Sequence, residues 1–423
     1  MSRQAKKRLI ITAIVCTVAV LVCTVPLFWG FLSGYGGPES RVERGQKTCS
    51  VTIGACDDVH IRIPRYMNGR KVTSIGVFNG SKIKSIKIPD SVTNISGGTF
   101  QFCHSLTKVN IPKGVTVINE YTFEECTSLE SIKLPNGITK IGNKAFGSCT
   151  ALKSITFPSK TAYIGEWAFT GCVSLTSLTF PDSMDSIGNR AFYECTGITE
   201  IDFGSGIDSI GDGAFMNCTS LTEVIIPENV SELGGGAFYG CTSLKKVVYN
   251  VGADHLVTRD SVFSNCTSLT DVTLGEGMTS IGSCMFMGCT SLTEIEIPEA
   301  VYEIGSSAFQ DCTSLRSIVI PNNVWSFGEG AFFGCSSLSD ITLSERTQEI
   351  KNNTFTGCSS LTSIVIPKSV EAIGSDVFKD CTSLTEIRYN GTTEEWSAID
   401  IAENWLGDVS VTVCCSNGTV EYN

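Results

Sequence analysis

Thirteen cysteines stand at a fixed spacing, and this constrains the fold of the chain more than any other feature. Those from Cys103 to Cys241 are 23 residues apart, and so are those from Cys266 to Cys381, with one interval of 25 residues between the two series. A fixed period of about 20–50 residues is typical of solenoids, propellers and repeat arrays. The 423 residues therefore predict one repeat architecture and not a series of separate domains.

Each repeat carries the same apolar pattern. Counted from each Cys, aliphatic residues stand at +3, +6 and +8 and Phe stands at +20, as in Leu292, Ile295, Ile297 and Phe309. The Ile-x-Ile step alternates with period two, so it predicts a short strand, which ends at the Pro often found at +9. The Gly-x-x-Ala-Phe-x-x-Cys stretch has three- and four-residue spacing and predicts a short helical turn.

A single repeat of this kind does not fold alone. Its few apolar side chains do not offset the entropy lost in ordering 23 residues. Stacking against neighbours adds inter-strand hydrogen bonds and covers both open faces. In such a stack we expect the column cysteines to be small buried residues with free thiols, because an odd number of equivalent positions cannot all pair.

The repeat motif resembles a known family. The sequence L-x-x-I-x-I-P followed by V-x-x-I-G-x-x-A-F-x-x-C is similar to the BspA-type leucine-rich repeat, over roughly Val59 to Asn390. The resemblance implies a curved, right-handed leucine-rich repeat solenoid of about 14 coils, built from short parallel strands and short helical turns. It also implies a surface protein that binds other macromolecules, often as an adhesin.

The N-terminus predicts a membrane anchor. Residues 1–8 carry four basic side chains and no acid, and residues 9–32 are 24 residues without a charge. About 20 apolar residues span a bilayer as a helix, so we expect an N-terminal transmembrane helix with residues 1–8 in the cytoplasm and the repeats extracellular. The alternative is a cleaved signal peptide and a secreted protein.

The rest of the chain divides by composition and motif. Residues 33–40 predict a flexible linker, residues 41–78 an N-terminal cap and entry segment, and residues 79–390 the leucine-rich repeats. Residues 391–423 predict a C-terminal cap made of a helix and a hairpin. The longer repeat between Cys241 and Cys266 is either a surface bulge or a contact point that presents His255 and Arg259.

The sequence holds no motif for catalysis. It lacks H-E-x-x-H, a P-loop, G-x-S-x-G and C-x-x-C, and it has only 3 His. We therefore expect a protein that is not an enzyme and has no cofactor and no metal site. The net charge of −12 argues against nucleic acid as a partner.

The candidate binding face is the solvent side of the predicted strands. Side chains at +5 and +7 flank the inward Ile-x-Ile pair, so they point outward. We expect Glu200, Asp202 and Glu223 to stack together, and likewise Asp271, Glu294 and Glu296. The acids that recur at these positions are Glu200, Asp202, Glu223, Asp271, Glu294, Glu296, Asp340 and Glu386.

The acidic residues of that face indicate a partner with a basic surface. We expect a non-enzymatic adhesion or recognition module that binds a host, matrix or cell-surface macromolecule. The alternative is a structural spacer or envelope protein without a specific ligand, whose acids only keep a flat face soluble.

Overall fold

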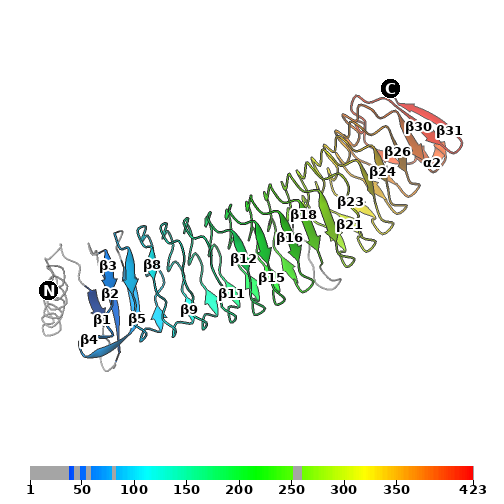
Figure 1. Cartoon of the computed structure of the whole chain (residues 1–423). Coiled ribbons are helices and arrows are strands. Elements are labelled where there is room, and N and C mark those ends of the chain that lie inside the picture. Colours follow the sequence, from blue (N-terminus) through cyan, green and yellow to red (C-terminus); the bar gives the residue numbers. More distant parts are fainter. Residues whose placement is uncertain (1–37, 42–47, 54–58, 79–81, 251–259, 423) are drawn as a thin grey trace, which may run out of the picture. The chain divides into compact units, whose positions relative to one another are not determined.

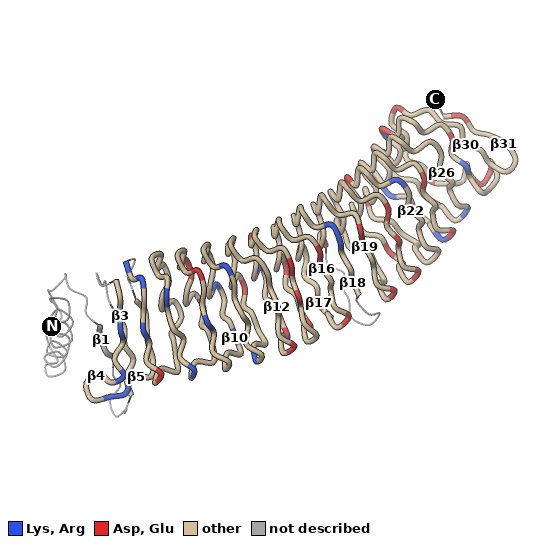
Figure 2. The backbone as a smooth tube through the Cα atoms, in the orientation of Figure 1, with Lys and Arg blue, Asp and Glu red and all other residues tan. Residues whose placement is uncertain are grey.

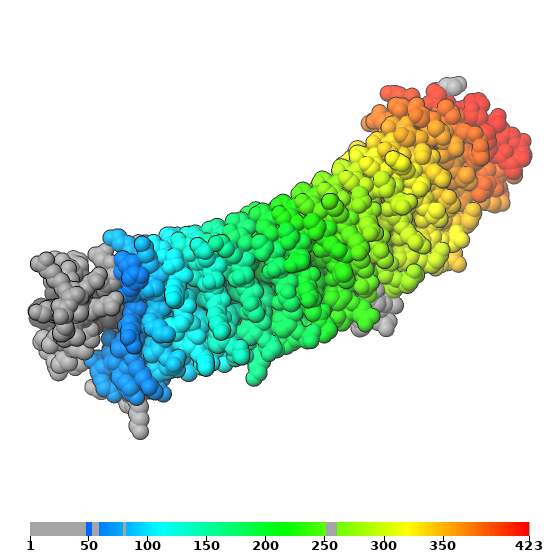
Figure 3. Space-filling model, viewed as in Figure 1, coloured from blue at the N-terminus to red at the C-terminus, as the bar shows by residue number. Residues whose placement is uncertain are grey.

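The computed structural model describes residues 38–41, 48–53, 59–78, 82–250 and 260–422. It divides into two compact units, Met1–Leu175 and Thr176–Asn423. Each unit is a β-solenoid, and the two together contain about 15 turns. Within each unit, successive repeats lie side by side in sequence order (Figures 1 and 3). The predicted solenoid is therefore confirmed for each unit.

Most Ile-x-Ile steps form the predicted parallel strands, but residues 131–134 and 154–157 share only an isolated bridge between Ser131 and Ser154, and residues 294–297 form no strand. The ladders are β3-β6-β8 in the first unit, and β12-β14, β16-β18-β19, β22-β24 and β26-β28 in the second. Each strand pairs with the equivalent strand of the next repeat, so Glu223 lies opposite Lys246 and Ser317 lies opposite Asp340. The strands are β3 (His60–Arg62), β6 (Ser85–Lys87), β8 (Lys108–Val109), β12 (Ser177–Thr179), β14 (Glu200–Asp202), β16 (Glu223–Ile226), β18 (Lys246–Tyr249), β19 (Asp271–Leu274), β22 (Ser317–Val319), β24 (Asp340–Thr342), β26 (Ser363–Ile366) and β28 (Glu386–Tyr389).

Most repeats also contribute a second, two-residue strand, which we did not predict. Its second residue is usually a buried Ile, and its ladders are also parallel. The first unit has β7 (Asn94–Ile95), β9 (Val117–Ile118), β10 (Lys140–Ile141) and β11 (Tyr163–Ile164). The second unit has β13 (Ser186–Ile187), β15 (Ser209–Ile210), β17 (Glu232–Leu233), β20 (Ser280–Ile281), β21 (Glu303–Ile304), β23 (Ser326–Phe327), β25 (Glu349–Ile350), β27 (Ala372–Ile373) and β29 (Asp400–Ile401).

The predicted helical turn is wrong. The Ala-Phe-x-x-Cys stretch is a series of tight turns with two left-handed residues, five and one before each column Cys, such as Lys144 (φ 52°) and Ser148 (φ 57°). Two left-handed residues four positions apart interrupt α-helical hydrogen bonding. The freed N–H groups donate to the next repeat, as from Phe146 to the carbonyl of Ala168 at 2.7 Å. The stretch thus adds another hydrogen-bonded connection between repeats.

Phenylalanine rings fill the core. Neighbouring rings of the Phe column have centroids 5.0–5.4 Å apart from Phe78 to Phe169 in the first unit. In the second unit the spacing is 5.3–5.9 Å from Phe192 to Phe378. All these rings are buried, so each repeat packs chiefly against its two neighbours.

The column cysteines are buried free thiols, as predicted. Their thiols are also hydrogen-bond donors, which the pattern did not indicate. The Sγ of Cys149 donates to the carbonyl of Phe123 at 3.1 Å, and that of Cys381 donates to the carbonyl of Phe355 at 3.1 Å. Burial raises the pKa of Cys149 to about 12, so the thiol stays protonated and inert.

Additional strands close the N-terminal end. The strands β1 (Pro38–Arg41), β2 (Thr48–Ile53), β5 (Arg70–Phe78) and β4 (Tyr66–Met67) form a sheet in that order, and β5 also pairs with β7. The predicted flexible linker of residues 33–40 therefore ends in a strand, because β1 pairs antiparallel with β2.

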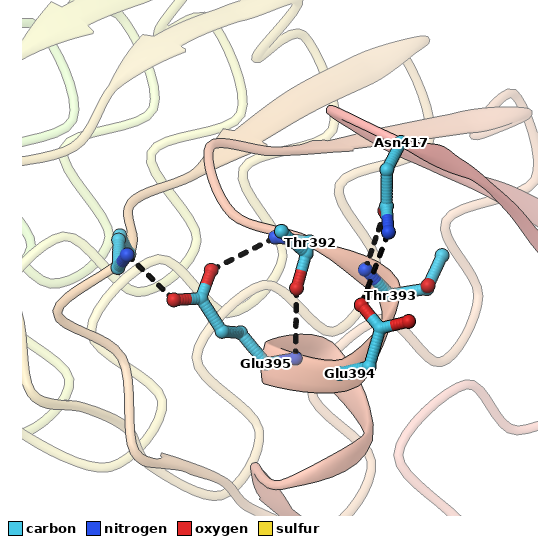
Figure 4. Close-up of polar contacts among 6 residues, drawn as sticks. Thr392, Thr393, Glu394, Glu395 and Asn417 are labelled. Carbon is cyan, nitrogen blue, oxygen red and sulfur yellow. Dashed lines mark hydrogen bonds and ion pairs between the residues drawn. The ribbon is translucent and has the colours of Figure 1, made fainter.

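A short helix and a hairpin close the C-terminal end. The described residues contain one α-helix, α2 (Thr393–Ser397), and it is followed by the antiparallel pair β30 (Val411–Cys415) and β31 (Gly418–Tyr422). A capping box between Thr392 and Glu395 begins α2, and Asn417 of the hairpin turn bonds to Thr393 and Glu394 (Figure 4). The ring of Trp405 packs 5.8 Å from that of Phe378 and covers the last Phe.

Several predictions lie outside the described residues. These are the anchor of residues 9–32, its basic flank 1–8, and the irregular segment with His255 and Arg259. In the described ranges, no helix is both long and apolar enough to cross a bilayer.

Candidate functional site

The acids of the candidate face all lie in the second unit, six of them on strands of the first series, whereas Glu294 and Glu296 occupy the equivalent positions of a repeat whose residues 294–297 form no strand. Exposed and buried side chains alternate along these strands, for example along Glu223–Ile226 and Asp340–Thr342. This is the period-two pattern that one buried sheet face produces. Seven of the eight candidate acids are exposed, and Glu386 is half-buried.

A lysine separates the two predicted stacks of acids. Lys246 lies between Glu223 and Asp271 in the strand register. Its Nζ bonds to the Glu223 carboxylate at 2.7 Å, and the hydrogen bond and charge of Glu223, with a smaller contribution from Asp271, raise the pKa of Lys246. The face is therefore not an unbroken run of like charges, and Glu223 already has a cationic partner.

Glu386 is also paired, within its own strand. The Nε of Arg388 donates to Glu386 Oε1 at 2.7 Å. This hydrogen bond is the main reason that the pKa of Glu386 lies below its usual range. Glu386 is therefore a weak candidate for binding a further cation.

Six acids remain without a salt bridge among the described residues. In the register, Glu200 lies opposite Ser177, and Asp340 lies opposite Ser317. β14, which carries Glu200, lies beside β16. We define the acidic strand face as these six exposed residues: Glu200, Asp202, Asp271, Glu294, Glu296 and Asp340.

The chemistry of this face is that of exposed carboxyl groups. It offers acceptor oxygens to Lys and Arg side chains of a partner and no nucleophile beside a base. In the part of the chain that the structure describes, no group of three or more His, Cys, Asp and Glu side chains is placed to hold a metal ion. Binding of a cationic surface is what the arrangement supports.

The two units carry net charges of opposite sign, and the net charge of the whole chain does not show this. Met1–Leu175 contains 21 Lys and Arg against 10 Asp and Glu, a net +11, and Thr176–Asn423 contains 10 against 33, a net −23. Figure 2 shows Lys and Arg over the early repeats and Asp and Glu over the later ones. Counting charge by segment is the sequence signal that finds this division.

Two exposed aromatic residues directly before strands of the second series were also missed. Tyr302 is 46% exposed and Trp325 is 50% exposed, and they lie on adjacent repeats, since the N–H of Trp325 donates to the carbonyl of Tyr302 at 3.2 Å. Without the second strand, the repeat pattern does not show which way these rings point.

Comparison with known proteins follows the repeat pattern. The BspA-type leucine-rich repeat region matches in six copies, over residues 67–172, 139–257 and 257–385. No curated protein matches the chain.

Two of the solved structures to which this chain is similar come from bacteria. A leucine-rich repeat protein from Bacteroides ovatus is 28% identical, with 88% of this chain and 97% of that chain covered and a TM-score of 0.66. A leucine-rich cell surface protein from Faecalibacterium prausnitzii is 24% identical, with 89% and 98% covered and a TM-score of 0.47.

Proposed function

The chain belongs to the BspA-type leucine-rich repeat family, and from this premise we propose that it is a cell-surface, non-enzymatic recognition or adhesion module. Its partner is a macromolecule with a basic surface, and the acidic strand face is the binding site. The observation that carries the proposal is the set of six exposed carboxylates without a salt bridge, all at the +5 or +7 position of their repeats.

Electrostatics supports a basic partner. Unpaired like charges on one sheet face repel one another and lower stability, and a basic partner removes that repulsion. The net charge of −23 on the second unit adds attraction at longer range, which speeds encounter and weakens with salt.

Residues 9–32 are proposed as the anchor that holds the repeats outside the cell. Protease added to intact cells that express the full chain is expected to degrade the repeats and leave the N-terminal flank. Repeats that resist external protease but are cut after lysis would contradict this orientation.

The test of the proposed function is a pair of matched variants of the full chain. In the strand-face variant, Ser replaces four acids of the acidic strand face, because Ser already stands at equivalent positions in other repeats: Glu200, Asp271, Glu294 and Asp340. In the control, Ser replaces four exposed acids elsewhere in the second unit: Glu299, Glu303, Glu349 and Glu371.

Both variants lose the same charge, so only position distinguishes them. We measure binding to surfaces coated with extracellular matrix extract at low and high salt. The proposal expects the strand-face variant to lose both binding and salt dependence, while the control binds like the parent. A structural spacer predicts equal, weak binding for all three proteins, and equal losses in the two variants would reject the strand face as the site.

A further inference from the structure

The first unit carries a basic counterpart of the acidic strand face. Arg62 of β3 and Lys87 of β6 are register partners, and Lys108 of β8 lies opposite Ser85. With Lys133, which stands at +7 of its repeat, these cations are exposed. None of the four forms a salt bridge within the described ranges. We define the basic strand face as Arg62, Lys87, Lys108 and Lys133.

The two faces are built on the same lattice. Both consist of outward side chains at equivalent positions of successive repeats, and hydrogen-bonded strands lie about 4.7–4.9 Å apart in any sheet. Cations on one face and carboxylates on the other are therefore spaced by the same repeat distance. Matched spacing lets several opposite charges meet at once when one face lies on the other.

We propose that the basic strand face of one copy of this chain binds the acidic strand face of a second copy. The inference rests on the proposed function, because it uses the same acidic face and names its basic partner. Neither face binds its own kind, since each would meet like charges. Association therefore joins the first unit of one copy to the second unit of another.

Charge complementarity on the chain itself favours a second copy over a foreign polyanion. The part of the first unit that follows the proposed anchor, residues 33–175, has 17 Lys and Arg against 10 Asp and Glu, a net +7, and the unit with the acidic face has −23. A polyanion such as a sulfated polysaccharide would satisfy the cations alone and would leave the carboxylates unpaired. A second copy satisfies both sets.

The experiment uses two charge-reversal variants and one control, all as the full chain in neutral detergent. The basic-face variant carries Arg62→Glu, Lys87→Glu and Lys108→Glu. The acidic-face variant carries Glu200→Lys, Asp271→Lys and Glu294→Lys. The control changes three exposed lysines of the first unit away from the strand face: Lys71→Glu, Lys113→Glu and Lys160→Glu.

Each chain is immobilised through a C-terminal tag, each is also used as the analyte, and circular dichroism verifies folding. The parent should bind itself at 50 mM NaCl with a Kd that rises at least about tenfold at 500 mM, as screening predicts. Each face variant should bind itself with a Kd at least about tenfold higher than the Kd of the parent at 50 mM NaCl. The two face variants mixed together should bind at least as tightly as the parent, and the control should match the parent.

The mixed pair is decisive, because restored binding requires opposite charges on the two faces. If the mixed pair fails to associate, or if the control loses as much as the basic-face variant, the proposal is overturned. It is also overturned if the parent does not self-associate but is retained by heparin through the basic face. None of these results depends on matrix extract, so the proposed function stands or falls separately in its own assay.

Discussion

Removing one ring from the Phe column should destabilise the solenoid locally. Phe215 is fully buried and stacks with Phe192 at 5.3 Å and Phe238 at 5.4 Å, while Phe203 meets its face at 5.6 Å and 81°. Replacement of a buried Phe by Ala typically costs about 3–5 kcal/mol, and ring pairs add about 0.5–1.5 kcal/mol each. We therefore expect Phe215→Ala to cost about 5 kcal/mol, the upper end of that range.

Hydrogen exchange of the full chain measures both the size and the extent of the effect. Because repeats couple to their nearest neighbours, amides between residues 192 and 238 should exchange about four thousandfold faster, at about 1.4 kcal/mol per tenfold. Amides around Phe332 should stay protected. The matched control is Phe102→Ala, whose ring is 49% exposed and whose loss should cost less than about 0.5 kcal/mol. Exchange that rises equally along the whole second unit would refute nearest-neighbour coupling.

Three further predictions concern single positions. Burial raises the pKa of Cys241 from 9.0 to about 12. Between these pH values the folded state keeps a proton that the unfolded state loses. The stability that this thiol contributes is therefore complete below pH 9 and falls by about 1.4 kcal/mol per pH unit up to pH 12. Urea unfolding at pH 8 and pH 10 should show Cys241→Ala less pH-dependent than the parent, and equal slopes would contradict the buried thiol. Ser148 is left-handed at φ 57°, so Ser148→Gly should raise stability by about 0.5–1 kcal/mol in the same unfolding assay, and a loss would show that the Ser side chain matters more than its backbone angle. Thr392→Ala removes the cap of α2 and should cost about 1 kcal/mol, seen as faster exchange of the first-turn amides, whereas unchanged exchange would exclude the capping role.

The repeat architecture was predictable because its signal is redundant. The same apolar positions recur in every repeat, so the inward columns and the period-two strands follow from spacing alone. The tight turns were not predictable in the same way. Apolar residues three and four apart suit a helix as well as consecutive turns. Glycine holds only some of the left-handed positions, and others hold side chains as different as Lys144, Trp167 and Arg190, so the glycine signature is not the same in every repeat.

The candidate face was predictable in exposure but not in pairing. Alternation along each strand gives the outward direction of Glu200 or Asp340 from sequence. The bond from Lys246 to Glu223 depends on which residues the strand register places opposite each other. The bond from Arg388 to Glu386 depends on two side chains that point to the same side of one strand. The sequence pattern alone therefore does not predict either ion pair.

Carboxyl footprinting of the bound chain tests the central claim most directly. The full chain, free or bound to a matrix-coated surface at low salt, is labelled at its carboxylates with a carbodiimide and an amine, and the label is measured by mass spectrometry. The account predicts that Glu200, Asp271, Glu294 and Asp340 lose labelling on binding, while Glu303 and Glu349 on the second strand series label as in the free chain. Protection of Glu303 and Glu349 with full labelling of the acidic strand face would contradict it.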